Sequence, residues 1–98
     1  LLDQAALANA PAAAARYDDL ARALGEEPRA DDAAGEAFAR AVRRLREGLR
    51  MGTGLRALGA TEDDIPRLAA NASRDPCLAT NPRPMAADEI AKVYARAL

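Results

Sequence analysis

Residue types that carry out catalysis are scarce in this chain. Its 98 residues include no histidine and one cysteine, Cys77. Histidine is the commonest general base and transition-metal ligand, and it activates the nucleophile of Ser-His and Cys-His pairs. A conventional hydrolase site is therefore not expected. No histidine can lower the pKa of Cys77, although Arg74 or Arg83 could approach it, so a small buried or half-buried thiol is favoured over a reactive one.

Pairs of aspartates are the remaining candidates for binding a metal ion. They occur at positions 18–19, 31–32 and 63–64. Adjacent side chains on a helix point about 100° apart, so such a pair does not converge on one cation, and none has the spacing of a calcium loop. We expect the last two pairs to compensate the dipoles at helix N-termini instead. The sequence thus predicts no metal-binding residue.

Phosphate and nucleic-acid binding are also disfavoured. The stretch "GTG" (52–54) lacks the strand and helix of a phosphate loop and is interpreted as a flexible helix end. The run "RAVRRLREGLR" (40–50) surrounds a leucine stripe, and 14 basic and 15 acidic residues give a net charge of −1. Because no excess positive charge would attract nucleic acid or an anionic membrane, we interpret this run as a solvated helix face. We predict no catalytic or cofactor-binding residue, and neither nucleic acid nor membrane as a partner.

Arg83 lies between two prolines, which hold the backbone extended and give the side chain a fixed direction. We favour a role in which Arg83 holds a helix C-terminus or a carboxylate, and contact with an anionic ligand is the alternative. Its segment, "RDPCLATNPRP" (74–84), is rich in turn-forming residues and is predicted to be a stiff connector between two helices.

The composition describes a chain with a thin core. Half of the residues are apolar, but many of these are alanines, and the aromatic residues are Tyr17, Phe38 and Tyr94. Alanine favours helix and fills little volume, so tight packing depends on a few larger aliphatic side chains. No apolar run approaches the roughly 18 residues of a membrane span. The lone cysteine fits a reducing compartment, and we predict a cytoplasmic location.

The elements predicted to carry these residues are all helices, and the fold class is all-α, a small bundle of four to five helices. No run of alternating β-branched residues is present. Asn9 is expected to cap the second helix and Gly25 to end it in a left-handed conformation. Thr61 or Asp64 is expected to cap the fourth. The helices are predicted at about 2–8, 11–24, from 31 or 32 to 50, 61–72 and 87–97.

Each longer helix has an apolar stripe that should face the core. Arginines at positions 40, 43, 44 and 50 are expected on the opposite side of the third helix. The predicted stripes are Tyr17, Leu20, Ala21 and Leu24; Phe38, Val42, Leu45 and Leu49; Ile65, Leu68, Ala69 and Ala72; and Ile90, Val93, Tyr94 and Leu98.

The second half of the chain resembles a known family. "GATEDDIPRLAANASRDPCLATNPRPMAADEIAKVYARAL" (59–98) is similar to the C-terminal end of the iron-containing (group III) alcohol dehydrogenases. The elements "DIPRLA", "DPC" and "TNPRP" occur in the family's order and at its intervals. "LLDQAALANAPAAAARYDDLARALG" (1–25) is similar to an earlier stretch of the same family. The middle segment, 26–52, matches only as an amphipathic helix.

This resemblance implies a two-domain NAD(P)-linked oxidoreductase that interconverts alcohols and aldehydes or ketones. Residues 1–98 would be part of its dehydroquinate synthase-like helical domain, a single domain separated from the nucleotide-binding domain. In the family, Fe²⁺ (or Zn²⁺) is held by an aspartate and three histidines, and the last histidine precedes the segment that Leu1 begins. No metal ligand and no glycine-rich nucleotide turn can therefore be transferred to this chain, which we expect to be inactive alone.

The implied partner is the missing N-terminal domain of the same enzyme, and a homo-oligomer is left open. Asp3 departs from the family pattern, which often has proline there, and Ala86 replaces the usual Ser or Thr cap of the last helix. A maleylacetate reductase-like C-terminal part is the related alternative, although Cys77 and Thr80 favour the alcohol dehydrogenases. A free-standing helical protein-interaction module is the alternative from a different class.

Overall fold

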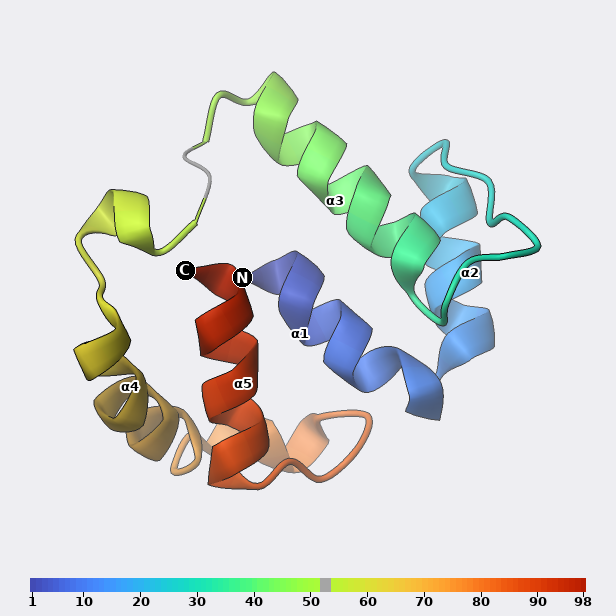
Figure 1. Cartoon of the computed structure of the whole chain (residues 1–98). Coiled ribbons are helices and arrows are strands. Elements are labelled where there is room, and N and C mark those ends of the chain that lie inside the picture. Colours follow the sequence, from blue (N-terminus) through green and yellow to red (C-terminus); the bar gives the residue numbers. More distant parts are fainter. Residues whose placement is uncertain (52–53) are drawn as a thin grey trace. The chain divides into compact units, whose positions relative to one another are not determined.

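The computed structural model describes residues 1–51 and 54–98 (Figure 1). Within these ranges the chain forms α-helices and short 3₁₀ helices (labelled η) with no β-strand, which confirms the all-α prediction. Most of the "GTG" stretch lies outside the described residues. The α-helices are α1 (Leu2–Asn9), α2 (Ala14–Ala23), α3 (Glu36–Gly48), α4 (Ile65–Ala72) and α5 (Ala87–Ala97), and the 3₁₀ helices are η1 (Ala10–Ala12), η2 (Arg56–Leu58), η3 (Glu62–Asp64) and η4 (Pro76–Thr80).

The chain divides into two compact units, which are described separately. Residues 2–52 form the first unit, and residue 1 with residues 53–98 forms the second. The prediction of a single helical domain over residues 1–98 stays a prediction. No helix among the described residues combines the length and the apolar character that crossing a bilayer requires.

In the first unit, α3 packs against both α1 and α2. The contact with α1 depends on Gly35, the residue before α3, which has φ +80°. A Cβ atom at this position would lie 2.5 Å from the Cβ of Ala10. Only glycine avoids both the clash and the strain of this backbone conformation. The helices therefore approach closely, over a core of alanines at positions 6, 10, 21, 37, 39 and 41.

The second predicted helix is wrong at its start. A continuous helix was expected from Pro11, but η1 covers Ala10–Ala12 and α2 begins at Ala14, because Ala13 leaves the helical region with φ −150°. Asn9 belongs to α1, is buried, and makes no side-chain capping bond to η1. The predicted end is confirmed, because Gly25 has φ +74°. The Gly25 N–H donates to Arg22 O at 2.9 Å and the Glu26 N–H to Ala21 O at 2.9 Å, the double closure of a Schellman motif.

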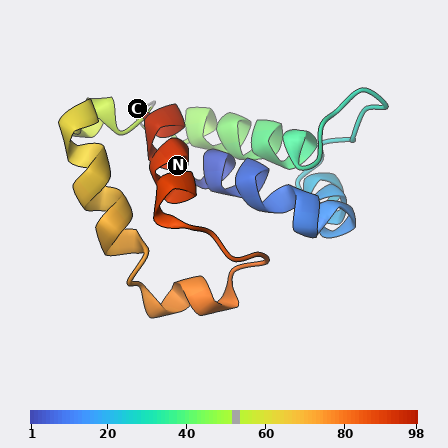
Figure 2. The same cartoon turned by 60° about the horizontal axis from the view of Figure 1, so that its bottom comes forward.

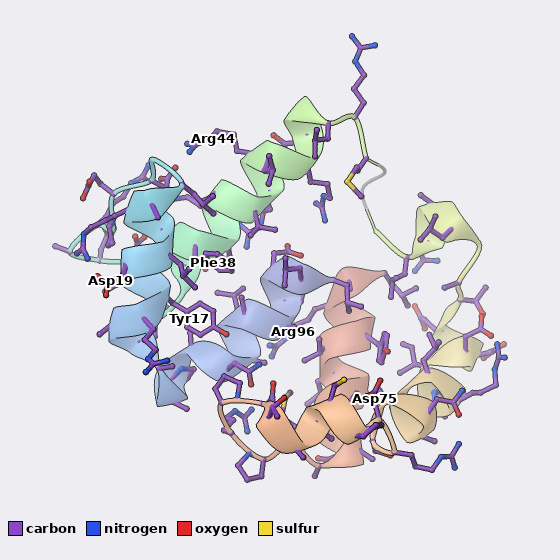
Figure 3. All side chains as sticks on the ribbon, turned by 180° about the vertical axis from the view of Figure 1, so that it is seen from behind. Tyr17, Asp19, Phe38, Arg44, Asp75 and Arg96 are labelled. Atoms are coloured by element: carbon purple, nitrogen blue, oxygen red, sulfur yellow. The ribbon has the colours of Figure 1, made fainter. Side chains whose placement is uncertain are left out.

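The start of α3 also differs from the prediction. The helix begins at Glu36 rather than at Asp31 or Asp32, because the left-handed Gly35 interrupts the helical backbone and Asp32 bonds to the loop and to Arg40. The predicted core stripe is only partly confirmed. The rings of Phe38 and Tyr17 lie 5.4 Å apart and point toward each other (Figure 3), whereas Leu45 and Leu49 are 55% and 62% exposed. The fully buried residues of α3 are instead alanines, at positions 37, 39 and 41.

The second unit is built on the packing of α4 against α5, which Figure 2 shows from a second angle. As predicted, Ile90 and Val93 of α5 are buried, together with Ala97, and Ala69 is the buried residue of α4. The Leu55 N–H donates to Ala97 O at 2.8 Å and ties the end of α5 to the segment before η2. The single turn η2 follows Leu55 and is closed by Gly59 at φ +88°.

The predicted Thr61-Asp64 capping box is present, but it caps η3, which leads directly into α4, and Asp64 makes no side-chain capping bond to α4. The Asp64 carboxylate accepts hydrogen bonds from the Thr61 N–H and from the Thr61 hydroxyl, both at 3.0 Å. Arg67 donates to the same carboxylate at 2.8 Å. These contacts, with Arg67 the largest, hold the pKa of Asp64 below its usual value. Pro66 follows in the first turn of α4, where its missing N–H leaves no partner unsatisfied.

Candidate functional site

The segment "RDPCLATNPRP" is more regular than the predicted connector, because Pro76–Thr80 form η4. Asp75 caps this helix (Figure 3): its carboxylate accepts the Cys77 N–H at 2.8 Å. The Thr80 hydroxyl donates to Cys77 O at 2.9 Å. A capping aspartate followed by proline is a favoured start for a short helix. Asp75, Pro76 and Thr80 of this segment therefore stabilise η4.

Cys77 is exposed, which contradicts the expectation of a buried or half-buried thiol. The whole of η4 lies at the surface, with no buried residue. A hydrogen bond with the Asp75 carboxylate, and its negative charge, raise the pKa of the Cys77 thiol. Because the thiolate is the nucleophilic form, this environment disfavours reactivity at neutral pH. The effect of Asp75 on the pKa, rather than burial of the side chain, therefore supports the preference for an unreactive thiol.

Arg83 holds a carboxylate, the role favoured from the sequence. Its Nη1 donates to Glu89 Oε1 at 2.9 Å, and the Asn81 side-chain amide donates to Arg83 O at 2.7 Å. Glu89 also accepts the Ala86 N–H at 3.1 Å, which is one half of a capping box. These two donors, the Ala86 N–H first, hold the pKa of Glu89 below its usual value. The "NPRP" run therefore fixes where α5 begins.

In the first unit, Arg40 of α3 is shielded, with 20% of its side chain exposed, whereas Arg44 is 57% exposed, as the predicted solvated face implies, and both are held in ion pairs. Arg40 Nε donates to Glu26 at 3.0 Å, and its two terminal nitrogens donate to Asp32 at 2.6 and 2.9 Å. Arg44 (Figure 3) donates to the other oxygen of Glu26 at 2.6 Å, and to the carbonyls of Leu24 and Gly25 at 3.2 and 3.4 Å. The loop before α3 is thereby attached to the helix by charge-assisted hydrogen bonds.

This network changes the protonation of its carboxylates. Hydrogen bonds from Arg40, and then from the Arg29 N–H, lower the pKa of Asp32 to about 2. Arg40, followed by Arg44, also holds the pKa of Glu26 below its usual value. The Asp31-Asp32 pair was predicted to lie at a helix N-terminus, but it lies in the loop before α3. The acidic "EEPRADD" stretch beside an arginine-rich helix was the sequence signal for this network.

A second charged group surrounds Asp3, in the first turn of α1. Asp3 is buried, and its carboxylate lies 3.3 Å from Arg43 Nε and 3.8 Å from Arg46 Nη1, both on α3. Burial raises the pKa of Asp3, but hydrogen bonds from Gln4 and Arg43 outweigh burial and lower it overall. A buried carboxylate needs such partners to stay ionised. Asp3, noted only as a departure from the family pattern, therefore joins α1 to α3.

The described residues do not supply a metal centre. Within 1–51 and 54–98, no three side chains of histidine, cysteine, aspartate or glutamate gather closely enough to hold an ion. The carboxylates that do cluster are already bound by arginines, as with Glu26 and Asp32 on Arg40. A guanidinium and a cation compete for the same oxygens, so this donor set does not fit iron or zinc. Among the described residues, the carboxylates of Glu26, Asp32 and Asp3 are held in ion pairs with arginines of α3.

Comparison with known proteins gives the family. All of residues 1–98 match the model of the Fe-containing alcohol dehydrogenase family, C-terminal. This chain belongs to that family. The crystal structure of a 1,3-propanediol oxidoreductase is similar to this member of the family, with 30% sequence identity and a TM-score of 0.88. The match covers 99% of this chain and 26% of that one, so the chain spans about a quarter of that oxidoreductase. No match was found among curated proteins.

These findings confirm the resemblance to the C-terminal end of the iron-containing alcohol dehydrogenases and the helical fold that it implied. The family match also includes residues 26–52, which the sequence had matched only as an amphipathic helix. The contacts of this stretch explain why its motif was hard to recognise. It is held by Arg40 and Arg44 on Glu26 and Asp32, and many arrangements of acidic and basic residues could supply equivalent ion pairs.

Proposed function

We propose that this chain is the C-terminal structural part of an iron-dependent, NAD(P)-linked alcohol dehydrogenase that interconverts alcohols and aldehydes or ketones. The observation that carries the proposal is the match of all 98 residues to the C-terminal family model. The likeness to a 1,3-propanediol oxidoreductase supports an alcohol as the substrate class. In such an enzyme the metal polarises the alcohol or carbonyl oxygen and the nicotinamide exchanges the hydride.

The chain's own contribution would be a rigid scaffold. Its clustered charges bind one another, as in the Arg40 network and the contact of Arg83 with Glu89, and fix where α3 and α5 begin. Metal ligands and the nucleotide site would come from an N-terminal domain, which is the partner we propose, within a cytoplasmic enzyme. The proposal leaves the oligomeric state of the parent enzyme open, as the sequence analysis did.

The test compares the 98-residue chain with the longer protein that includes the residues before it. We expect the longer protein to oxidise a primary alcohol or diol with NAD⁺ or NADP⁺, to lose activity with a chelator and to regain it with Fe²⁺ or Zn²⁺. The chain alone should be inactive under all these conditions. An open reading frame without an upstream histidine pattern and glycine-rich turn would overturn the proposal. So would turnover of maleylacetate in place of alcohols, or turnover by the chain alone.

A further inference from the structure

The first unit has an open apolar groove between the C-terminal ends of α2 and α3. Its volume is about 260 Å³, and its lining residues are Leu24, Ala41, Arg44, Leu45, Gly48 and Leu49. Leu24, Leu45 and Leu49 are 44%, 55% and 62% exposed. The sequence predicted that all three leucines face the core. A row of large aliphatic side chains at helical spacing that stays open to water is typical of a surface that another element covers.

The lining of the groove indicates what kind of element would cover it. The polar side chain at its edge, Arg44, already donates to Glu26 and to the carbonyls of Leu24 and Gly25. The groove therefore offers no unused charge for an ionic ligand. Its small residues are Ala41 and Gly48, and, apart from the adjoining residues of α3 itself, no atom lies within 4 Å of where a Cβ atom of Gly48 would stand. Small residues between leucines allow a helix to pack closely, so the occupant should be an apolar helix face.

The groove lies at the end of the first unit where α1 begins. Asp3, in the first turn of α1, contacts Arg43 and Arg46 in the C-terminal half of α3. At the other end, the last turn of α1 leads into Ala10, which lies against Gly35 at the start of α3. Helices α1 and α3 are thus antiparallel (Figure 1). Polypeptide that precedes α1 therefore joins the first unit toward the same end of α3 that carries Leu45 and Leu49.

We propose that this groove, lined by Leu24, Leu45 and Leu49, is the docking site for an apolar helical segment of the polypeptide that precedes this chain in its parent enzyme. The inference rests on the proposed function. The family model is a C-terminal one, and the similar oxidoreductase is about four times as long, so the additional polypeptide would precede α1. A segment attached at this end has a high effective concentration at the groove, which favours it over a second copy.

Cysteine labelling tests the proposal in the chain and in the longer protein. In a Cys77→Ser background, Leu49→Cys places a thiol in the groove. Leu58→Cys is the matched control, because Leu58 is 83% exposed and belongs to the second unit. At low protein concentration, a maleimide should modify the Leu49→Cys variant about tenfold more slowly in the longer protein than in the chain, because labelling then requires local opening. The Leu58→Cys variant should react at the same rate in both.

Three results would overturn the proposal. They are equal labelling of the Leu49→Cys variant in both proteins, protection in the chain alone that increases with its concentration, and the absence of a preceding polypeptide. The second result would indicate that another copy occupies the groove. Because a cysteine could disturb α3, the Leu45→Glu and Leu58→Glu variants provide a second measurement. Only Leu45→Glu should lower the melting temperature of the longer protein, and equal melting of the two variants would also contradict the proposal.

An activity assay on the unlabelled longer protein separates this proposal from the proposed function. Alcohol oxidation without protection of the Leu49→Cys variant would overturn the docking site and leave the function standing. Protection without alcohol oxidation would do the reverse.

Discussion

At the scale of single residues, the chain's charges form specific ion pairs with one another. Arg40 and Arg44 attach the loop of residues 25–32 to α3, while Asp3 attaches α1 to the same helix. Exposed ion pairs usually contribute little to stability, but these carboxylates are largely shielded, and several pairs share partners. Their side chains are 13% exposed for Glu26 and 12% for Asp32. Protonation of these carboxylates at low pH should therefore weaken the fold first at this network.

Replacing Asp32 by asparagine should lower stability at neutral pH and change its response to acid. The folded-state pKa of Asp32, about 2, lies below its usual 3.8. The ionised carboxylate thus stabilises the fold above pH 4, and this contribution is lost as the pH falls toward 2. The difference in melting temperature between wild type and Asp32→Asn should be largest near pH 6 and shrink toward pH 2. Asp31→Asn, at the exposed neighbour, is the control at pH 6, and a constant difference for Asp32→Asn would contradict the prediction.

The Cys77 thiol should become more reactive when Asp75 loses its charge. Asp75 raises the pKa of Cys77 by hydrogen bond and by charge. In the Asp75→Asn variant the amide oxygen can still accept the Cys77 N–H and cap η4, while the thiolate is no longer repelled. We expect faster reaction with a disulfide reagent at pH 7.5. Asp88→Asn removes the same charge from α5, and an equal acceleration there would attribute the effect to net charge alone.

At the scale of elements, glycines and caps decide where the helices begin and end. Gly25 follows the end of α2. Gly35, at φ +80°, is the residue before α3, and its left-handed backbone sets where that helix begins. The sequence identified Gly25 because it follows a regular apolar stripe. The role of Gly35 was missed because the acidic residues before it look like a good helix start. A cap is chosen by backbone geometry as well as by side chain, and that geometry follows from the packing of α1 on α3.

Gly35→Ala and Gly48→Ala should change stability in opposite directions. Gly35 has a left-handed backbone, and a Cβ atom added there would lie 2.5 Å from the Cβ of Ala10, so alanine should destabilise the fold by more than about 1 kcal/mol. Gly48 lies in α3 with open space around it, so alanine should stabilise by about 0.5–1 kcal/mol. Chemical denaturation measures both. Gly59→Ala, at φ +88° without a clash, separates backbone strain from the contact with Ala10.

A hydroxyl at position 86 should stabilise α5. Ala86 is the residue before this helix, and Glu89 already accepts its N–H. Alanine cannot supply the other half of the capping box, an oxygen for the N–H of residue 89. Ala86→Ser should therefore raise the free energy of unfolding by about 0.5–2 kcal/mol. Ala95→Ser, inside α5, should instead lower it by about 0.5 kcal/mol. If both variants behave alike, capping is not the cause.

At the scale of the whole molecule, the described residues form a scaffold with large apolar side chains on its surface. The buried core consists mainly of alanines, and Leu20, Leu24, Leu45, Leu49 and Leu58 are 44% to 83% exposed. A free-standing interaction module would be expected to bury more of its leucines. The free energy gained from burying alanine is small, because it scales with the apolar area removed from water.

The chain alone should therefore be marginally stable. We expect a broad thermal transition, an unfolding free energy at or below the lower end of the usual range of about 5–15 kcal/mol, and binding of a hydrophobic dye in the folded state. Leu45→Glu should reduce dye binding because it places a charge in the groove of the first unit. Circular dichroism, sizing chromatography and dye fluorescence give these quantities. A sharp transition of a monomer that binds no dye would favour the free-standing module.

The amino-acid sequence by itself determined the helical class, the end of α2 at Gly25, the Thr61-Asp64 cap, the family, and the carboxylate-binding role of Arg83. The helical class and the family follow from composition and motif order, and the other three features are contacts between residues a few positions apart, so patterns along the chain predict them. Tertiary structure decided the start of α3, the partners of Arg40, Arg44 and Asp3, and which leucines stay exposed. Those features join residues up to 43 positions apart, as Asp3 and Arg46 are. Which of several acidic or apolar residues faces a helix depends on how that helix packs, and hydrophobic periodicity does not specify the packing partner.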